Sequence, residues 1–233
     1  MPSRILAIFA LPALIVFLLV LIVGYLIWWP LVFLAPFAAA GIVWFLWRRA
    51  DRSILDKLNA RPLGQLERER IMNTVENLCL TSGIDQPDVF AIDSDAINLV
   101  ALSGVNDSLV ATTGLLESFD ALEMEGVVAH SLSKLSSGAI AYETLAASAE
   151  PLLTGVQRNW VNQWGTGDAG VIAFDISGVG LTRYPPGLRS ALERIDGRST
   201  DIEGAEALGS ALLVPPAARR IPLDHRIEVL WEL

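Results

Sequence analysis

The pattern of apolar and polar positions changes sharply near residue 50. From Ile5 to Trp47 no charged residue occurs, and this stretch is about twice the length that one helix needs to cross a bilayer. Pro30 follows two tryptophans and is the natural position for a turn. The pattern therefore predicts a hairpin of two transmembrane helices, which span about 5–27 and 31–47.

Basic residues flank this hairpin on its outer sides and are missing from its turn. They are Arg4, Arg48, Arg49 and Arg52. The positive-inside rule then places both chain ends in the cytoplasm and the turn outside. We expect a multi-pass protein of the cell (inner or plasma) membrane, with the hairpin at 1–50 and a cytoplasmic domain at 51–233. A cleaved signal peptide is the alternative, although the apolar stretch far exceeds the apolar core of such a peptide.

Beyond residue 50 the pattern predicts an α+β domain with a small sheet and several helices. Short apolar runs predict strands at 89–92, 98–102 and 108–113. Helical spacing of apolar residues predicts helices at 51–77 (interrupted at 61–64), 123–135, 137–156, 173–182, 186–195 and 223–233. Segments 159–170 and 198–204 are predicted to be loops.

Charge and cysteine content exclude several classes of function. Three of the 17 basic residues and none of the 26 acidic residues lie in the first 50, which leaves 14 basic and 26 acidic residues beyond them. A domain this acidic repels phosphate backbones, so we expect no nucleic-acid partner, and it also argues against a broad polybasic lipid contact. The single cysteine, Cys79, excludes an intrachain disulfide and a cysteine-rich metal site.

Several sequence blocks occur in an order and spacing typical of one protein family. They are Asn98–Ala101, Leu109–Leu116, Leu122–His130, Asp175, Leu181–Leu188, Ala191–Ile195, Val214–Pro216 and Leu223–Ile227. Together the blocks resemble the HtpX-type membrane zinc metalloendopeptidases, which have a gluzincin fold, and they cover most of the chain. The resemblance implies that a zincin-like peptidase domain follows the transmembrane hairpin.

The zinc site that the resemblance implies is degenerate in this sequence. The family motif His-Glu-x-x-His reads His130-Ser131-Leu132-Ser133-Lys134, so a serine replaces the general base and a lysine replaces the second ligand. The third ligand, a glutamate four residues before Asp175, is replaced by Val171. We therefore expect no catalytic residue, no metal and no cofactor, and zinc only if atypical ligands hold it.

These residues allow other interpretations. Ser131 and Lys134 also form a Ser-x-x-Lys motif, but its partner motifs are missing, so a polar helix face is the simpler interpretation. His130 and His225 are the only histidines and could not rebuild the zinc site unaided. We interpret His130 as a buried remnant of the site, and Glu143 as part of a solvated helix face.

The sequence thus predicts a catalytically inactive, membrane-anchored metallopeptidase homologue that acts as a scaffold, adaptor or regulatory subunit of a membrane protein complex. Its expected partners are other membrane proteins and the lipid bilayer. A cleft for a peptide or partner would include Asn98, Val100, His130, Ser131 and Lys134, because the strand at 98–102 would lie at the cleft edge and edge strands accept extended peptides. An active zinc metalloendopeptidase of protein quality control with atypical ligands, and a purely structural complex subunit, are the alternatives.

Overall fold

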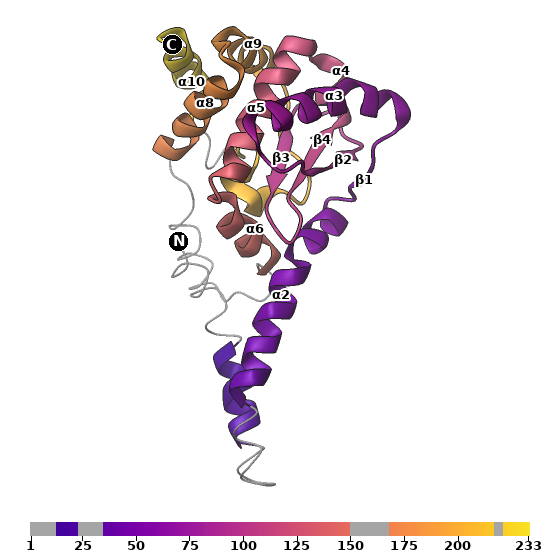
Figure 1. Ribbon diagram of the computed structural model, residues 1–233, viewed down its shortest axis with the longest axis vertical. Coiled ribbons are helices and arrows are strands. Elements are labelled where there is room, and N and C mark those ends of the chain that lie inside the picture. The colour runs from indigo at the N-terminus through magenta and orange to yellow at the C-terminus, as the bar shows by residue number, and fades with distance from the viewer. Residues whose placement is uncertain (1–12, 23–34, 150–167, 217–220) are drawn as a thin grey trace.

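The computed structural model describes residues 13–22, 35–149, 168–216 and 221–233 of the chain. A long helix, α2, projects from a body in which further helices surround a small sheet (Figure 1). Most of the predicted first span, the start of the second, the end of the predicted helix at 137–156 and most of the predicted loop at 159–170 lie outside the described residues. None of the described helices combines the length and the apolarity that crossing a membrane requires.

Helix α2 runs without interruption over Ala35–Lys57. It joins the end of the predicted second span to the charged segment that follows, so the predicted boundary at residue 50 falls inside one helix. The arginines at this boundary do not end the helix, because arginine has a high helix propensity. The chain leaves the helical conformation at Asn59, whose φ is positive (51°).

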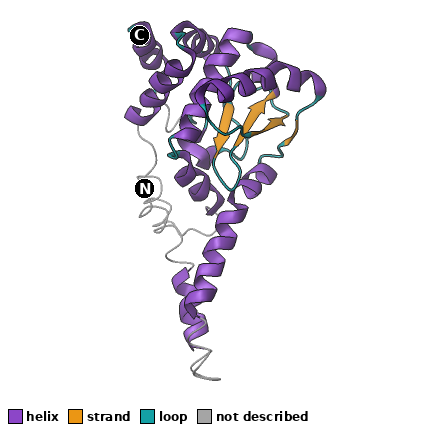
Figure 2. Ribbon diagram, viewed as in Figure 1, coloured by secondary structure: helices purple, strands orange, loops and turns teal. Residues whose placement is uncertain are grey.

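The sheet has four strands in the order β1-β2-β4-β3 (Figure 2). They are β1 (Arg61–Pro62), β2 (Asp88–Ile92), β3 (Leu99–Leu102) and β4 (Ser108–Thr112). Strands β2 and β4 are parallel, whereas β3 forms an antiparallel hairpin with β4. The three predicted strands are confirmed. β1 was missed because it has two residues and a proline, which is tolerated at a sheet edge and reads as an interruption in the sequence.

Strands β3 and β4 are buried on both faces of the sheet, although β3 lies at its edge. Side chains alternate along the strand, so Leu99 and Ala101 join one apolar cluster while Val100 and Leu102 join another. The first cluster lies against the helices that carry the family blocks, and the second lies toward the end of α2.

The helices of the body follow the predicted order. They are α3 (Gln65–Ser82), α4 (Thr113–Ser118), α5 (Ala121–Ser136), α6 (Ile140–Ala149), α8 (Asp168–Thr182), α9 (Pro185–Ile195), a 3-10 helix η3 (Glu206–Ala211) and α10 (Leu223–Trp231). One predicted loop needs correction, because helix α8 already begins at Asp168, inside the predicted loop at 159–170. The predicted loop at 198–204 is confirmed, and η3, which the sequence did not predict, follows it.

Helix α5 is fixed at its start and along its sides. Asp120 Oδ1 accepts hydrogen bonds from the amides of Leu122 and Glu123, and the Glu123 carboxylate accepts one from Asp120 N, which forms a capping box. Helices α8 and α9 approach α5 closely, because a Cβ atom on Gly178 would lie 2.7 Å from the Cα atom of His130 and one on Gly126 would lie 2.4 Å from a backbone nitrogen of α9. This tight packing places α8 directly against the family motif.

Candidate functional site

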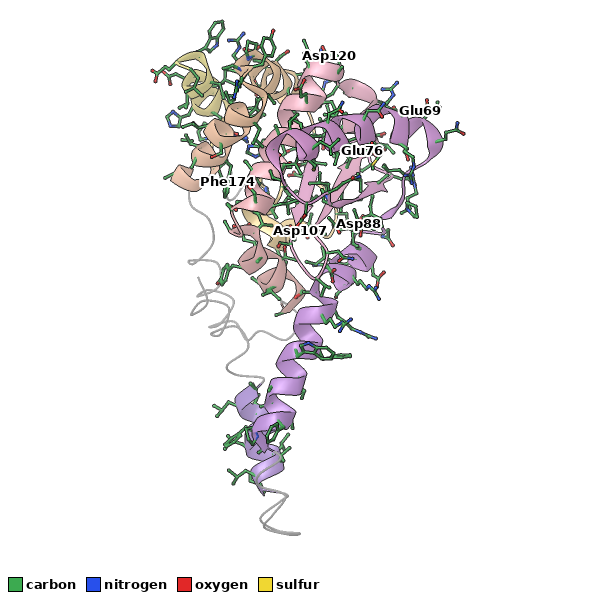
Figure 3. All side chains as sticks on the ribbon, viewed as in Figure 1. Glu69, Glu76, Asp88, Asp107, Asp120 and Phe174 are labelled. Atoms are coloured by element: carbon green, nitrogen blue, oxygen red, sulfur yellow. The ribbon has the colours of Figure 1, made fainter. Side chains whose placement is uncertain are left out.

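The residues of the predicted site lie inside the domain. His130, Ser131 and Lys134 on α5 are each at most 1% exposed, and Asn98 and Val100 beside them are fully buried. Helix α8 covers this part of α5, and the backbone carbonyl of Phe174, which is labelled in Figure 3, accepts a hydrogen bond from Ser133 Oγ at 3.1 Å. The structure therefore brings the predicted residues together as a buried cluster.

An aspartate and an arginine hold the retained histidine. Asp175 Oδ1 lies 2.8 Å from His130 Nδ1, and both carboxylate oxygens accept 2.7 Å hydrogen bonds from Arg226 on α10. Burial alone would raise the pKa of Asp175, but Arg226 and His130 lower that pKa below its ordinary range. Asp175 is therefore a carboxylate that orients an imidazole, as carboxylates do behind the histidine ligands of metal sites.

The histidine itself is neutral at physiological pH. Burial, followed by the positive charge of Lys134, lowers the pKa of His130 to about 3. Nδ1 lies 2.8 Å from Asp175 Oδ1, and neither ring nitrogen forms a hydrogen bond of good geometry among the described residues. His130 is thus a buried neutral imidazole beside a carboxylate.

Lys134, at the position of the second ligand, is tied to another part of the chain. Its Nζ atom donates a 2.7 Å hydrogen bond to the carbonyl oxygen of Leu212, and the side chain is fully buried. Burial, followed by the charge of Arg226, lowers the pKa of Lys134 to about 7. At neutral pH the amine is only partly charged, so charge repulsion opposes metal binding less than the sequence suggested. The hydrogen bond to Leu212 O opposes it more directly, because it directs the amine away from a metal at this position.

The residues present do not fit a catalytic zinc ion. Such a site needs three protein ligands and one open position. His130 offers one nitrogen, Lys134 is engaged by Leu212, and Val171, which is buried on α8 one turn before Asp175, has no donor atom. In the described part of the chain, no group of three or more His, Cys, Asp or Glu side chains is placed to hold a metal.

The free edge of β3 is covered by the chain itself. Val100 pairs with Leu212 in an antiparallel bridge, and Leu213 N donates a 2.8 Å hydrogen bond to Leu99 O. We call Leu212–Val214 the covering segment. An extended peptide would reach the edge of β3 only if this segment moved away.

Asn98 and Arg226 hold the covering segment in place. Asn98 Nδ2 donates to Val214 O (2.9 Å) and Thr200 O (2.7 Å), and its Oδ1 accepts from Val214 N (3.2 Å). Arg226 Nη1 donates to Leu213 O at 2.8 Å. Each residue of the covering segment is therefore bound by a buried polar side chain, since Lys134 binds Leu212.

Two buried groups of this region were missed in the sequence. Arg226 was only part of a family block, yet it lies three residues after Leu223 and four before Leu230, on the apolar side of α10, and a charge in that position indicates a buried partner. Glu143 was interpreted as solvated, and this is wrong: it is buried, and Ser210 Oγ donates a hydrogen bond to it. Glu143 lies in an alanine-rich helix, where the spacing of apolar residues does not indicate that it is buried.

Several proteins named HtpX protease homologues are similar to this chain in sequence. No protein-family model matches the chain. A "Protease HtpX homolog" from Bacteroides fragilis is 29% identical over 219 residues, which cover 84% of this chain and 67% of that protein. Homologues of the same name from Dictyoglomus thermophilum (26% over 210 residues, 73% and 68%) and Tropheryma whipplei (27% over 180 residues, 62% and 62%) are also similar.

The described residues form a mixed α+β fold with a small four-stranded sheet. The chain is similar to several proteins named HtpX protease homologues, as the sequence blocks indicated.

Proposed function

We propose that this chain is a catalytically inactive, membrane-anchored homologue of the HtpX-type proteases that serves as a scaffold, adaptor or regulatory subunit of a membrane protein complex. The observation that carries the proposal is the buried hydrogen bond from Lys134 to Leu212 O. It fills the position of the second metal ligand and ties that position to the segment that covers β3. Ser131 and Val171 supply neither a base nor a ligand.

The covering segment changes which kind of binding the proposal favours. In an active peptidase of this class, we expect an extended substrate along the edge of β3. Here that edge pairs with Leu212, and three buried polar side chains bind the segment. The proposed scaffold therefore contacts its partners through outer surfaces, and the predicted cleft opens only if the segment is displaced.

Membrane anchoring is part of this proposal. Its support is the uncharged stretch up to Trp47 and the continuous helix α2 that joins the end of that stretch to the domain. The flanking arginines favour a cytoplasmic domain. Extraction of cell membranes with alkaline carbonate tests the anchor, because an integral protein stays in the pellet and a peripheral one is released.

Metal content and protease activity test the loss of catalysis. We expect the full-length chain, purified in detergent from zinc-supplemented cells, to hold far less than one zinc ion per chain and to leave unfolded casein intact. Stoichiometric zinc together with cleavage that a chelator abolishes would contradict the proposal.

A restored variant tests whether the site geometry is that of the family. S131E/K134H/V171E returns the base and two ligands to the framework of His130 and Asp175, and we expect it to bind zinc near one ion per chain. The matched control S131E/K134H/V171A lacks the third ligand and should bind zinc much more weakly. Equal zinc binding by the two folded variants would mean that residue 171 does not face the metal position.

One observation favours the alternative of an active enzyme with atypical ligands. His130 keeps its orienting carboxylate, and its Nε2 atom has no hydrogen-bond partner among the described residues. Both features are expected of a histidine that binds a metal. The zinc measurement on the unaltered chain decides between the two functions. A purely structural role in a complex predicts instead that one partner co-purifies in fixed stoichiometry.

A further inference from the structure

A surface hollow lies where α2 meets the domain. It has a volume of about 470 Å³, and its lining includes Phe45, Arg49, Arg52, Ser53 and Asp56 from α2 and Ser148 from α6. These α2 residues recur at intervals of three and four, so they share one side of the helix. Beyond this junction, α2 projects from the body of helices (Figure 1).

At this junction, two aromatic side chains are each followed one helical turn later by an arginine. The guanidinium group of Arg48 lies 5.1 Å from the ring centre of Trp44, and that of Arg49 lies 4.8 Å from the ring centre of Phe45. Trp44 is 60% exposed and Phe45 is 50% exposed. Exposed aromatic rings one turn before exposed arginines are typical of the boundary between the apolar and the headgroup layers of a membrane.

Arg49 and Arg52 bring positive charge to the hollow, and Asp56 brings one carboxylate. Within the described part of the chain, no carboxylate forms an ion pair with the side chains of Arg48, Arg49 or Arg52. The chain beyond residue 50 is strongly acidic, with 26 acidic and 14 basic residues. A local positive site on such a protein attracts an anion, whereas the acidic remainder of the protein repels it.

We propose that this hollow binds the headgroup of an anionic phospholipid. Arg49 and Arg52 bind the phosphate, since guanidinium groups match phosphate oxygens in bidentate geometry. Ser53 and Asp56 face the hydroxyl groups of a glycerol headgroup, while the exposed rings of Trp44 and Phe45 lie on the acyl side. The inference rests on the membrane anchoring in the proposed function, and it gives the otherwise acidic chain one specific contact with lipid.

Lipid selectivity of the full-length chain tests this site. We would add phosphatidylglycerol, or phosphatidylcholine as the neutral lipid, to detergent-purified protein and measure retained lipid by native mass spectrometry. We expect phosphatidylglycerol to bind at least about tenfold more tightly than phosphatidylcholine. R49Q/R52Q should lose this preference, and R49K/R52K should keep part of it because charge remains while the bidentate geometry is lost.

The matched control is R68Q/R198Q, which removes the same charge from two exposed arginines of the body. It should keep the full preference for phosphatidylglycerol. An equal preference in R49Q/R52Q and the unaltered chain would overturn the proposal, as would displacement of the lipid by equimolar inorganic phosphate. Carbonate extraction separates the two failures: a chain that stays in membranes but shows no lipid preference refutes this site alone, whereas a chain that is released refutes the anchor.

Discussion

Two arginine clusters of this protein have similar hydrogen bonds and opposite surroundings. Arg226 binds Asp175 through two 2.7 Å bonds, and all of these groups are about 1% exposed. Arg61 binds Glu67 through two 2.7 Å bonds and also contacts Asp93, but its side chain is 36% exposed and that of Asp93 is 73% exposed. Loss of a partner should therefore cost more stability in the first cluster than in the second, because water can replace a lost partner only in the second.

The difference explains how a degenerate site can remain ordered. A buried charge whose partner is removed costs about 3–5 kcal/mol, whereas an exposed ion pair contributes about 0–1 kcal/mol. Asp175 and Arg226 are thus expected to stabilise the fold whether or not a metal binds. Lys134 and Arg226 both donate hydrogen bonds to the covering segment in this buried region.

The largest effect should follow from breaking the buried pair. D175N removes the charge that Arg226 faces, and we expect the free energy of unfolding to fall by about 3–5 kcal/mol. Urea unfolding of the full-length chain, followed by circular dichroism, measures the change. The double variant D175N/R226M removes both charges and should recover part of the loss. A fall of less than about 1 kcal/mol in D175N would show that water reaches this pair.

The second effect concerns the pH dependence that Lys134 imposes. Its pKa is lowered from 10.5 to about 7 on folding, so between these values the unfolded chain binds more protons than the folded chain. Stability from this group therefore rises with pH above 7 and is lowest below it, with a slope of at most about 1.4 kcal/mol for each pH unit.

The variant K134M isolates that slope. We expect the unaltered chain to gain stability relative to K134M as the pH rises from 7 to 9, in parallel urea titrations. A K134A variant also removes the amine and in addition leaves a cavity, so it should show the same loss of slope with a lower overall stability. Parallel curves for the unaltered chain and K134M would mean that Lys134 keeps its ordinary pKa.

A smaller effect is expected at the covering segment. N98A removes the side-chain hydrogen bonds to the buried backbone groups of Val214 and Thr200 and should cost about 1–3 kcal/mol. It should also speed hydrogen exchange at Leu213 N, which bonds Leu99 O, relative to the amides of β4. Unchanged exchange at Leu213 would show that the strand pairing holds the segment without Asn98.

The sequence predicted the elements better than the contacts of the site. The strands of the sheet and helix α5 follow from local apolar spacing, and family blocks located His130, Ser131, Lys134 and Val171. The bond from Lys134 joins it to a residue 78 positions away, and that from Arg226 to Asp175 spans 51 positions. Such pairings depend on how the helices pack against one another, and the spacing of apolar residues along the chain carries no information on that packing. The closed edge of β3 could not be predicted for the same reason.

The smallest effect should appear in the exposed cluster, and it completes the comparison with Asp175. Asp93 accepts two hydrogen bonds from Arg61, which lower the pKa of Asp93, but its carboxylate lies in solvent. We expect D93N to leave the melting temperature unchanged within error at physiological salt, because water and Glu67 still satisfy the guanidinium group. The measurement should be repeated at low salt, where screening is weaker. A loss as large as that of D175N would mean that hydrogen-bond geometry, and not burial, sets the strength of both clusters.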